Sequence, residues 1–128
     1  MGLFDKIFGE PSSESKLKIN WIPLTDISQL DEIKNQSKTS AIFIFKHSTR
    51  CGISRMVIKQ FEKLFEEKHQ NIKVYYLDLL NYRNISNAIE EQFKVEHQSP
   101  QLIVIKNENS VEATSHYDIT QIDLEKYI

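Results

Sequence analysis

The chain has 128 residues, of which 40% are hydrophobic and 27% are charged, a length and composition typical of one soluble globular domain with a substantial core. Its formal net charge is −2, which gives no electrostatic case for binding nucleic acid or an anionic membrane. Its one cysteine, Cys51, cannot form an internal disulfide and so argues against a secreted, disulfide-stapled fold.

Residues 1–17 are predicted to form a flexible N-terminal segment and linker. Their apolar residues extend over only about two helical turns, too few for a stable helix alone, and Pro11–Ser15 is a run of turn-forming residues. The segment lacks the apolar core and the cleavage site of a signal peptide. No run in the chain reaches the roughly 20 apolar residues that span a membrane. We therefore expect a cytoplasmic protein without a membrane span, whose domain covers residues 18–128.

Hydrophobic spacing predicts alternating strands and helices along this domain. The strands are expected at about residues 19–24, 41–45, 72–79, 101–106 and 111–117. The helices are expected at about residues 25–36, 51–68, 84–93 and 120–127. The run Ala41–Phe45 is wholly apolar, as in strands that are covered on both faces, and the polar residues 46–50 are expected to end it.

The resulting order, β-α-β-α-β-α-β-β-α, predicts an α/β three-layer sandwich around a central mixed sheet. Parallel strands joined by helices account for the first part of the chain, and the last two strands form an antiparallel hairpin. This order of elements is that of the thioredoxin fold.

Cys51 lies where a buried strand and a short polar loop give way to a helix. The unpaired N–H groups of a first helical turn favour a negative charge. Arg50 and Arg55 flank the cysteine, and no acidic residue occurs between Glu32 and Glu62. Because the thiolate is the reactive form of cysteine, this setting predicts a nucleophilic sulfur. The alternative is a small, inert buried thiol.

Three neighbours of Cys51 are candidates for supporting roles. The hydroxyl of Ser54 can donate a hydrogen bond to a thiolate but cannot form a disulfide, so the chemistry would need only one protein thiol; otherwise Ser54 is a capping or surface serine. His47 can transfer protons or serve structure. Arg50 can bind a carboxylate of a small thiol or stay solvated. The other histidines show no metal-ligand spacing, and we expect no metal site: His69, His97 and His116.

The segment Lys46–Ser54, Lys-His-Ser-Thr-Arg-Cys-Gly-Ile-Ser, resembles the bacillithiol-system thioredoxin-like family, the YtxJ family of monothiol bacilliredoxins. The resemblance extends over roughly residues 19–128. Family members are expected to read Thr-Cys-Pro-Ile-Ser, so this chain departs from them at Arg50 and Gly52. Thioredoxin-like proteins usually carry Cys-x-x-Cys, and Ser54 stands here at the position of the second cysteine.

The resemblance also implies a cis peptide bond at Ser99–Pro100, beside Cys51. The Ser99 backbone would then pair with a bound substrate as an added strand does. The alternative is a proline that merely begins a strand.

By this resemblance, the protein is expected to be a monothiol thiol–disulfide oxidoreductase. It would remove a low-molecular-weight thiol, such as bacillithiol, from mixed disulfides on client proteins, using that thiol as co-substrate and no tightly bound cofactor. The nucleophile would be Cys51. The residues expected to contact substrate are Arg50, Ser54, Ser99 and Pro100, and those expected to support the site are His47, Thr49 and Gly52. The rival hypotheses are a non-enzymatic binding module and a thiol sensor that is capped at Cys51.

Overall fold

The sheet of this protein has five strands in the order β1-β3-β2-β4-β5. The structure, a computed structural model, describes residues 18–128, so the predicted flexible segment lies outside the described residues. The strands are β1 (Asn20–Pro23), β2 (Ile42–His47), β3 (Lys73–Asp78), β4 (Gln101–Lys106) and β5 (Asn109–Ser115). β3 is parallel to both β1 and β2, whereas β4 is antiparallel to both β2 and β5. The predicted mixed sheet is therefore confirmed.

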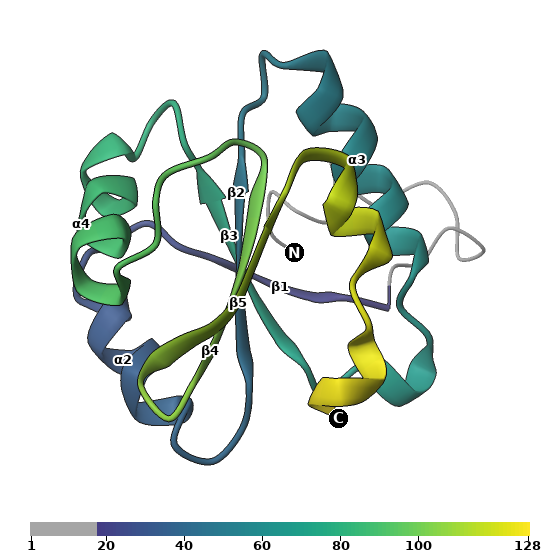
Figure 1. The fold of residues 1–128 in the computed structure, drawn as a ribbon, viewed down its shortest axis with the longest axis horizontal. Coiled ribbons are helices and arrows are strands. Elements are labelled where there is room, and N and C mark those ends of the chain that lie inside the picture. Colours follow the sequence, from purple (N-terminus) through teal and green to yellow (C-terminus); the bar gives the residue numbers. More distant parts are fainter. Residues whose placement is uncertain (1–17) are drawn as a thin grey trace, which may run out of the picture.

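Helices cover both faces of the sheet, which Figure 1 shows edge-on. One face carries α2 (Gln29–Gln36) and α4 (Arg83–Phe93). The other carries α3 (Gly52–Lys63) and three 3₁₀ turns, η2 (Glu67–His69), η3 (His116–Gln121) and η4 (Leu124–Tyr127). This arrangement is the three-layer α/β sandwich that the order of elements predicted.

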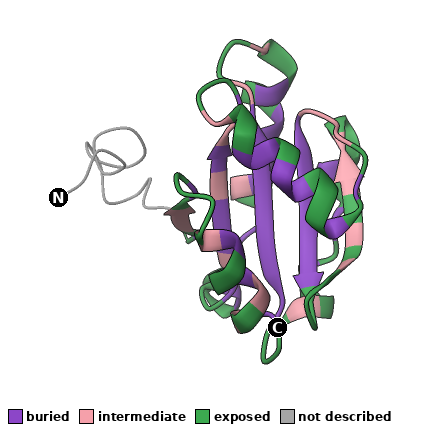
Figure 2. Cartoon of the chain, turned by 90° about the vertical axis from the view of Figure 1, so that its left-hand side faces the viewer, coloured by how far each residue is buried: buried purple, intermediate pink, exposed green. Residues whose placement is uncertain are grey.

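β2 lies at the centre of the sheet, between β3 and β4, and contributes to a core on each face. Side chains alternate along a strand, so Phe43 and Phe45 pack toward α3 while Ile42 and Ile44 pack toward α2 and α4. All four are completely buried. Figure 2 shows the central strands in the buried colour, whereas the helices also carry exposed residues. The two-sided burial predicted for this strand is confirmed.

β2 continues through Lys46 and His47, which were expected to lie in the loop. Both residues stay in register with β3, and Lys46 also pairs with Gln101 of β4. Their side chains point to opposite faces and are buried, with Lys46 0% and His47 6% exposed. Strand pairing, on both sides at Lys46 and with β3 at His47, thus outweighs the polar character of these side chains, because it satisfies the backbone at the centre of the sheet.

α3 ends at Lys63 rather than near Lys68 as predicted. Glu66 is extended, with φ −116° and ψ 177°, and its N–H donates to Nδ1 of His69 at 2.9 Å instead of continuing the helix. The His69 ring is buried against Phe65. A local hydrogen bond between Glu66 and His69 therefore begins η2 where a further turn of α3 was predicted.

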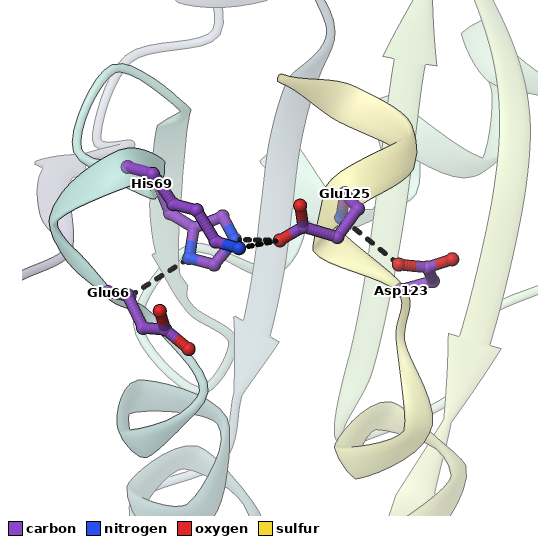
Figure 3. Close-up of polar contacts among 5 residues, drawn as sticks. Glu66, His69, Asp123 and Glu125 are labelled. Carbon is purple, nitrogen blue, oxygen red and sulfur yellow. Dashed lines mark hydrogen bonds and ion pairs between the residues drawn. The ribbon is translucent and has the colours of Figure 1, made fainter.

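The predicted last helix is wrong, because two 3₁₀ turns take its place. Ile122 is extended between η3 and η4, and the Asp123 carboxylate accepts the Glu125 N–H at 3.1 Å to begin the second turn. Glu125 then accepts a hydrogen bond from Nε2 of His69 at 2.8 Å (Figure 3). Ile119 and Leu124 remain buried against the sheet. The spacing of apolar residues therefore predicted which side chains are buried, but not the type of helix.

Replacing Lys46 with methionine is expected to stabilise the fold by roughly 2–3 kcal/mol at pH 7. Burial lowers the pKa of Lys46 from 10.5 to about 8, an effect that Glu90 opposes. Below pH 8, folding therefore buries an ammonium group. Between pH 8 and 10.5 the unfolded chain holds a proton that the folded protein has released, so wild-type stability rises with pH and the advantage of the variant shrinks. Urea titrations across this range measure the difference.

The control is Lys59→Met on the exposed side of α3, which should change stability little. A Lys46→Met protein that is less stable than the wild type throughout the range would contradict the expectation.

Candidate active site

Cys51 is the residue immediately before α3, with φ −98° and ψ 123° and a half-buried thiol. Its carbonyl accepts the Arg55 N–H at 3.0 Å, and its own N–H donates to the Ser48 carbonyl at 3.1 Å. The first turn of α3 contains no acidic residue. The structure thus places Cys51 at the predicted junction between the loop and α3.

The hydroxyl of Ser54 is buried and makes two hydrogen bonds. Its Oγ lies 2.8 Å from Nδ1 of His47 and accepts the Ser48 N–H at 3.1 Å. The sequence predicted a hydrogen bond from this hydroxyl to the sulfur of Cys51, but in the structure its hydrogen bonds are to His47 and Ser48. Ser54 therefore ties the active-site loop and α3 to the end of β2, and a bond to sulfur is still only a prediction.

Asp78 lies beside His47, although sequence reasoning did not single it out. It is the last residue of β3 and is paired with His47 in the parallel register, so both side chains point to the α3 face. Burial lowers the pKa of His47; the Asp78 carboxylate opposes this shift, and the Arg55 guanidinium adds to it. The available signal was an acidic residue at the end of a buried strand, because parallel strands end at the same edge of a sheet.

The Ser99–Pro100 peptide bond is cis, as the resemblance implied. Pro100 is buried and leads directly into β4. Since β4 runs antiparallel to β2, the proline loop meets the end of β2 that leads to Cys51. The side chain of Gln101 steadies this loop, donating to the Glu96 carbonyl at 3.0 Å.

Three predicted site residues lie at the exposed rim of the Cys51 loop. Thr49 and Arg50 are exposed, and Gly52 is the first residue of α3. Arg55 folds back over this rim and donates from Nη1 to the Thr49 carbonyl at 3.0 Å. The rim therefore combines two guanidinium groups with the cysteine, which suits an anionic ligand.

The other histidines have contacts outside the Cys51 loop. Nε2 of His69 donates to Glu125 at 2.8 Å, and Nδ1 of His97 lies 3.4 Å from Oγ of Ser86. The backbone N–H of His116 donates to the Pro100 carbonyl at 3.0 Å and so holds the proline loop. Within residues 18–128, no group of three or more His, Cys, Asp and Glu side chains could hold a metal ion. No helix in the same range is long and apolar enough to cross a membrane.

The mixed sheet, the cysteine before α3 and the cis-proline before β4 define a protein of the thioredoxin class. A solved protein with a thioredoxin fold, described provisionally as an oxidoreductase, matches with a TM-score of 0.67 and 31% identity, over 77% of this chain and 85% of that one. Thioredoxin from Schistosoma mansoni matches with a TM-score of 0.64 and 18% identity, over 85% of this chain and 96% of its own. Malassezia sympodialis thioredoxin matches with a TM-score of 0.63 and 16% identity, over 77% and 81%.

Residues 22–124 match the family model of monothiol bacilliredoxin BrxC. The chain belongs to the monothiol bacilliredoxin family. Membership implies thiol–disulfide oxidoreductase chemistry of the bacilliredoxin type, and the resemblance drawn from the Lys46–Ser54 segment is confirmed.

Replacing Gly52 with proline, the residue expected in other family members, should leave the protein equally stable or stabilise it by about 0.4–1 kcal/mol. Proline is favoured at the first position of a helix. The extended conformation of Cys51 suits a residue that precedes proline, and a Cβ at position 52 would meet only Nη2 of Arg55, at 3.9 Å. Urea denaturation measures the change, with Gly52→Ala as the matched control. A loss above about 1 kcal/mol for the proline variant alone would contradict this account of the helix start.

Proposed function

We propose that this protein removes a low-molecular-weight thiol, bacillithiol or a similar one, from mixed disulfides on protein cysteines. One observation carries the proposal: the single cysteine lies at the start of α3, and Ser54 stands where a second cysteine would be. Membership of the monothiol bacilliredoxin family supports it.

The reaction needs two exchange steps. The Cys51 thiolate attacks the small-thiol sulfur of the client mixed disulfide; a new disulfide forms at Cys51, and the client cysteine leaves as a thiolate that takes up a proton. A second molecule of the small thiol, as thiolate, then attacks the adduct and restores Cys51 while a symmetric disulfide leaves. Because Ser54 cannot form a disulfide, the second sulfur must come from solution.

The exposed rim supplies contacts for the small thiol and the client. The guanidinium of Arg50 would bind a carboxylate of the small thiol. The Ser99 backbone beside cis-Pro100 would pair with the client main chain. Thr49 and Gly52 shape the loop that presents the sulfur.

Apolar side chains next to the site suit a protein client. Ile53 and Met56 of α3 are 43% and 47% exposed. Tyr117 of η3 is also exposed and its hydroxyl donates to Sδ of Met56 at 3.8 Å, so the three side chains lie on one surface close to Cys51. Large apolar side chains exposed together are typical of a contact surface for another protein.

Cys51→Ser is expected to reduce the release of small thiol to the rate seen without protein. The test substrate is a folded protein that carries bacillithiol, or glutathione for comparison, on one cysteine. Intact-mass spectrometry should show the small thiol first on Cys51 and then released when free thiol is added.

Two outcomes would contradict the proposal. An adduct on Cys51 that forms once and is not released by free thiol would favour the sensor. No transfer at all, with wild type and Cys51→Ser alike, would favour the binding module.

A further inference from the structure

Asp78 is the last residue of β3, so its carboxylate lies where that strand ends. One oxygen of the carboxylate, Oδ1, is buried and has no hydrogen bond among the described residues. The other oxygen, Oδ2, accepts from the side chain of Asn81 at 2.7 Å. A buried carboxylate oxygen with no partner is costly unless a charge nearby compensates it. The nearest titratable neighbour in the strand register is His47.

His47 connects this carboxylate to the helix start that bears Cys51. Its Nδ1 lies 2.8 Å from Oγ of Ser54. Cys51 immediately precedes α3 and Ser54 follows three residues later, a spacing that places two side chains on the same side of a helix start. Asp78, His47 and Ser54 are thus neighbours in turn, and Ser54 stands three residues after Cys51 at the start of α3.

We propose that Ser54 and His47 form a proton relay for Cys51 and that Asp78 stabilises the imidazolium which the relay creates. This inference rests on the proposed function, since it assigns a role within the exchange reaction. Ser54 and His47 handle the proton of the reacting sulfur, while Asp78 is a positioning residue that acts through His47.

The S–H bond of Cys51 breaks as its proton passes to Oγ of Ser54, and the hydroxyl proton of Ser54 passes to Nδ1 of His47. The result is a thiolate opposite an imidazolium. When the thiolate attacks the mixed disulfide, the proton returns through Ser54 to the leaving client sulfur and forms its thiol.

The charged and titratable groups around His47 fit this cycle. Asp78 faces it from β3 and Arg55 from α3. Tyr76, whose ring lies 5.7 Å from the imidazole, stays neutral because burial, Asp78 and Glu62 raise its pKa to about 12. Burial and Arg55 keep the pKa of His47 below its ordinary value despite Asp78. The imidazolium is therefore favoured only while a thiolate stands opposite it.

Asp78→Asn is the decisive variant. The relay predicts that this change slows the alkylation of Cys51, whereas a direct effect of the Asp78 charge on the sulfur predicts that it speeds alkylation. In the relay the carboxylate stabilises the thiolate–imidazolium pair, so its loss should slow the alkylation of Cys51 by iodoacetamide about three- to tenfold near pH 6.5. If Asp78 acted on the sulfur only through its own negative charge, its loss would speed alkylation. The pH–rate profile from pH 5 to 10 records either result.

Two controls separate the relay from a structural role. Asp78→Glu keeps the charge and should restore much of the rate, and Asp31→Asn makes the same change on the exposed surface of α2 and should leave the profile unchanged. In a His47→Asn background, which retains a donor toward Ser54 but cannot take up a proton, Asp78→Asn should have no further effect. Thermal unfolding checks that each variant is folded.

An unchanged or faster rate for Asp78→Asn, or an effect of the same size in the His47→Asn background, would overturn the relay. Neither result touches the proposed function, which fails only if Cys51 does not exchange with mixed disulfides. If the variants showed the expected alkylation rates but the wild-type protein did not exchange with mixed disulfides, the relay would stand and the proposed function would fail.

Discussion

β2 is hydrogen-bonded to a strand on each side and covered by helices on both faces. Most of the site depends on this confinement. Its parallel neighbour β3 brings Asp78 beside His47, and its antiparallel neighbour β4 brings cis-Pro100 toward the same end of the sheet. Three segments that are far apart in the sequence therefore meet where β2 releases the chain into the Cys51 loop.

The two polar residues that end β2 show how the sheet divides roles between its faces. Lys46 points toward α4, where its ammonium is buried without a hydrogen bond among the described residues. His47 points toward α3, where its Nδ1 is hydrogen-bonded to the hydroxyl of Ser54. Because successive strand residues face opposite ways, one of these groups can serve the reacting sulfur while the other is confined to the far side.

Ser54 has a second consequence besides removing the internal disulfide. A hydroxyl at this position can accept from the backbone and exchange a hydrogen with an imidazole at the same time. The helix start is thereby joined to the buried polar pair of the sheet. A protein with one thiol has to manage the proton of each leaving sulfur without a neighbouring cysteine, and this connection offers a route.

The sequence by itself determined the order of the five strands and the three α-helices between them, the buried strand at Ala41–Phe45 and the place of Cys51 before a helix. These are local properties, since apolar spacing and a lone cysteine can be read over a few residues. It also carried the family resemblance, through the motif around Cys51.

The tertiary structure alone decided the burial of Lys46 and His47, the end of α3 at Lys63 and the replacement of the last helix by 3₁₀ turns. It also decided the approach of Asp78 to His47. The burial of Lys46 and His47 and the approach of Asp78 depend on partners distant in sequence, namely the strands beside β2. The turns that follow α3 and end the chain are joined by the contact of His69 with Glu125. Local propensity carries no information about such partners, because the free energy that favours them arises only when the chain is packed.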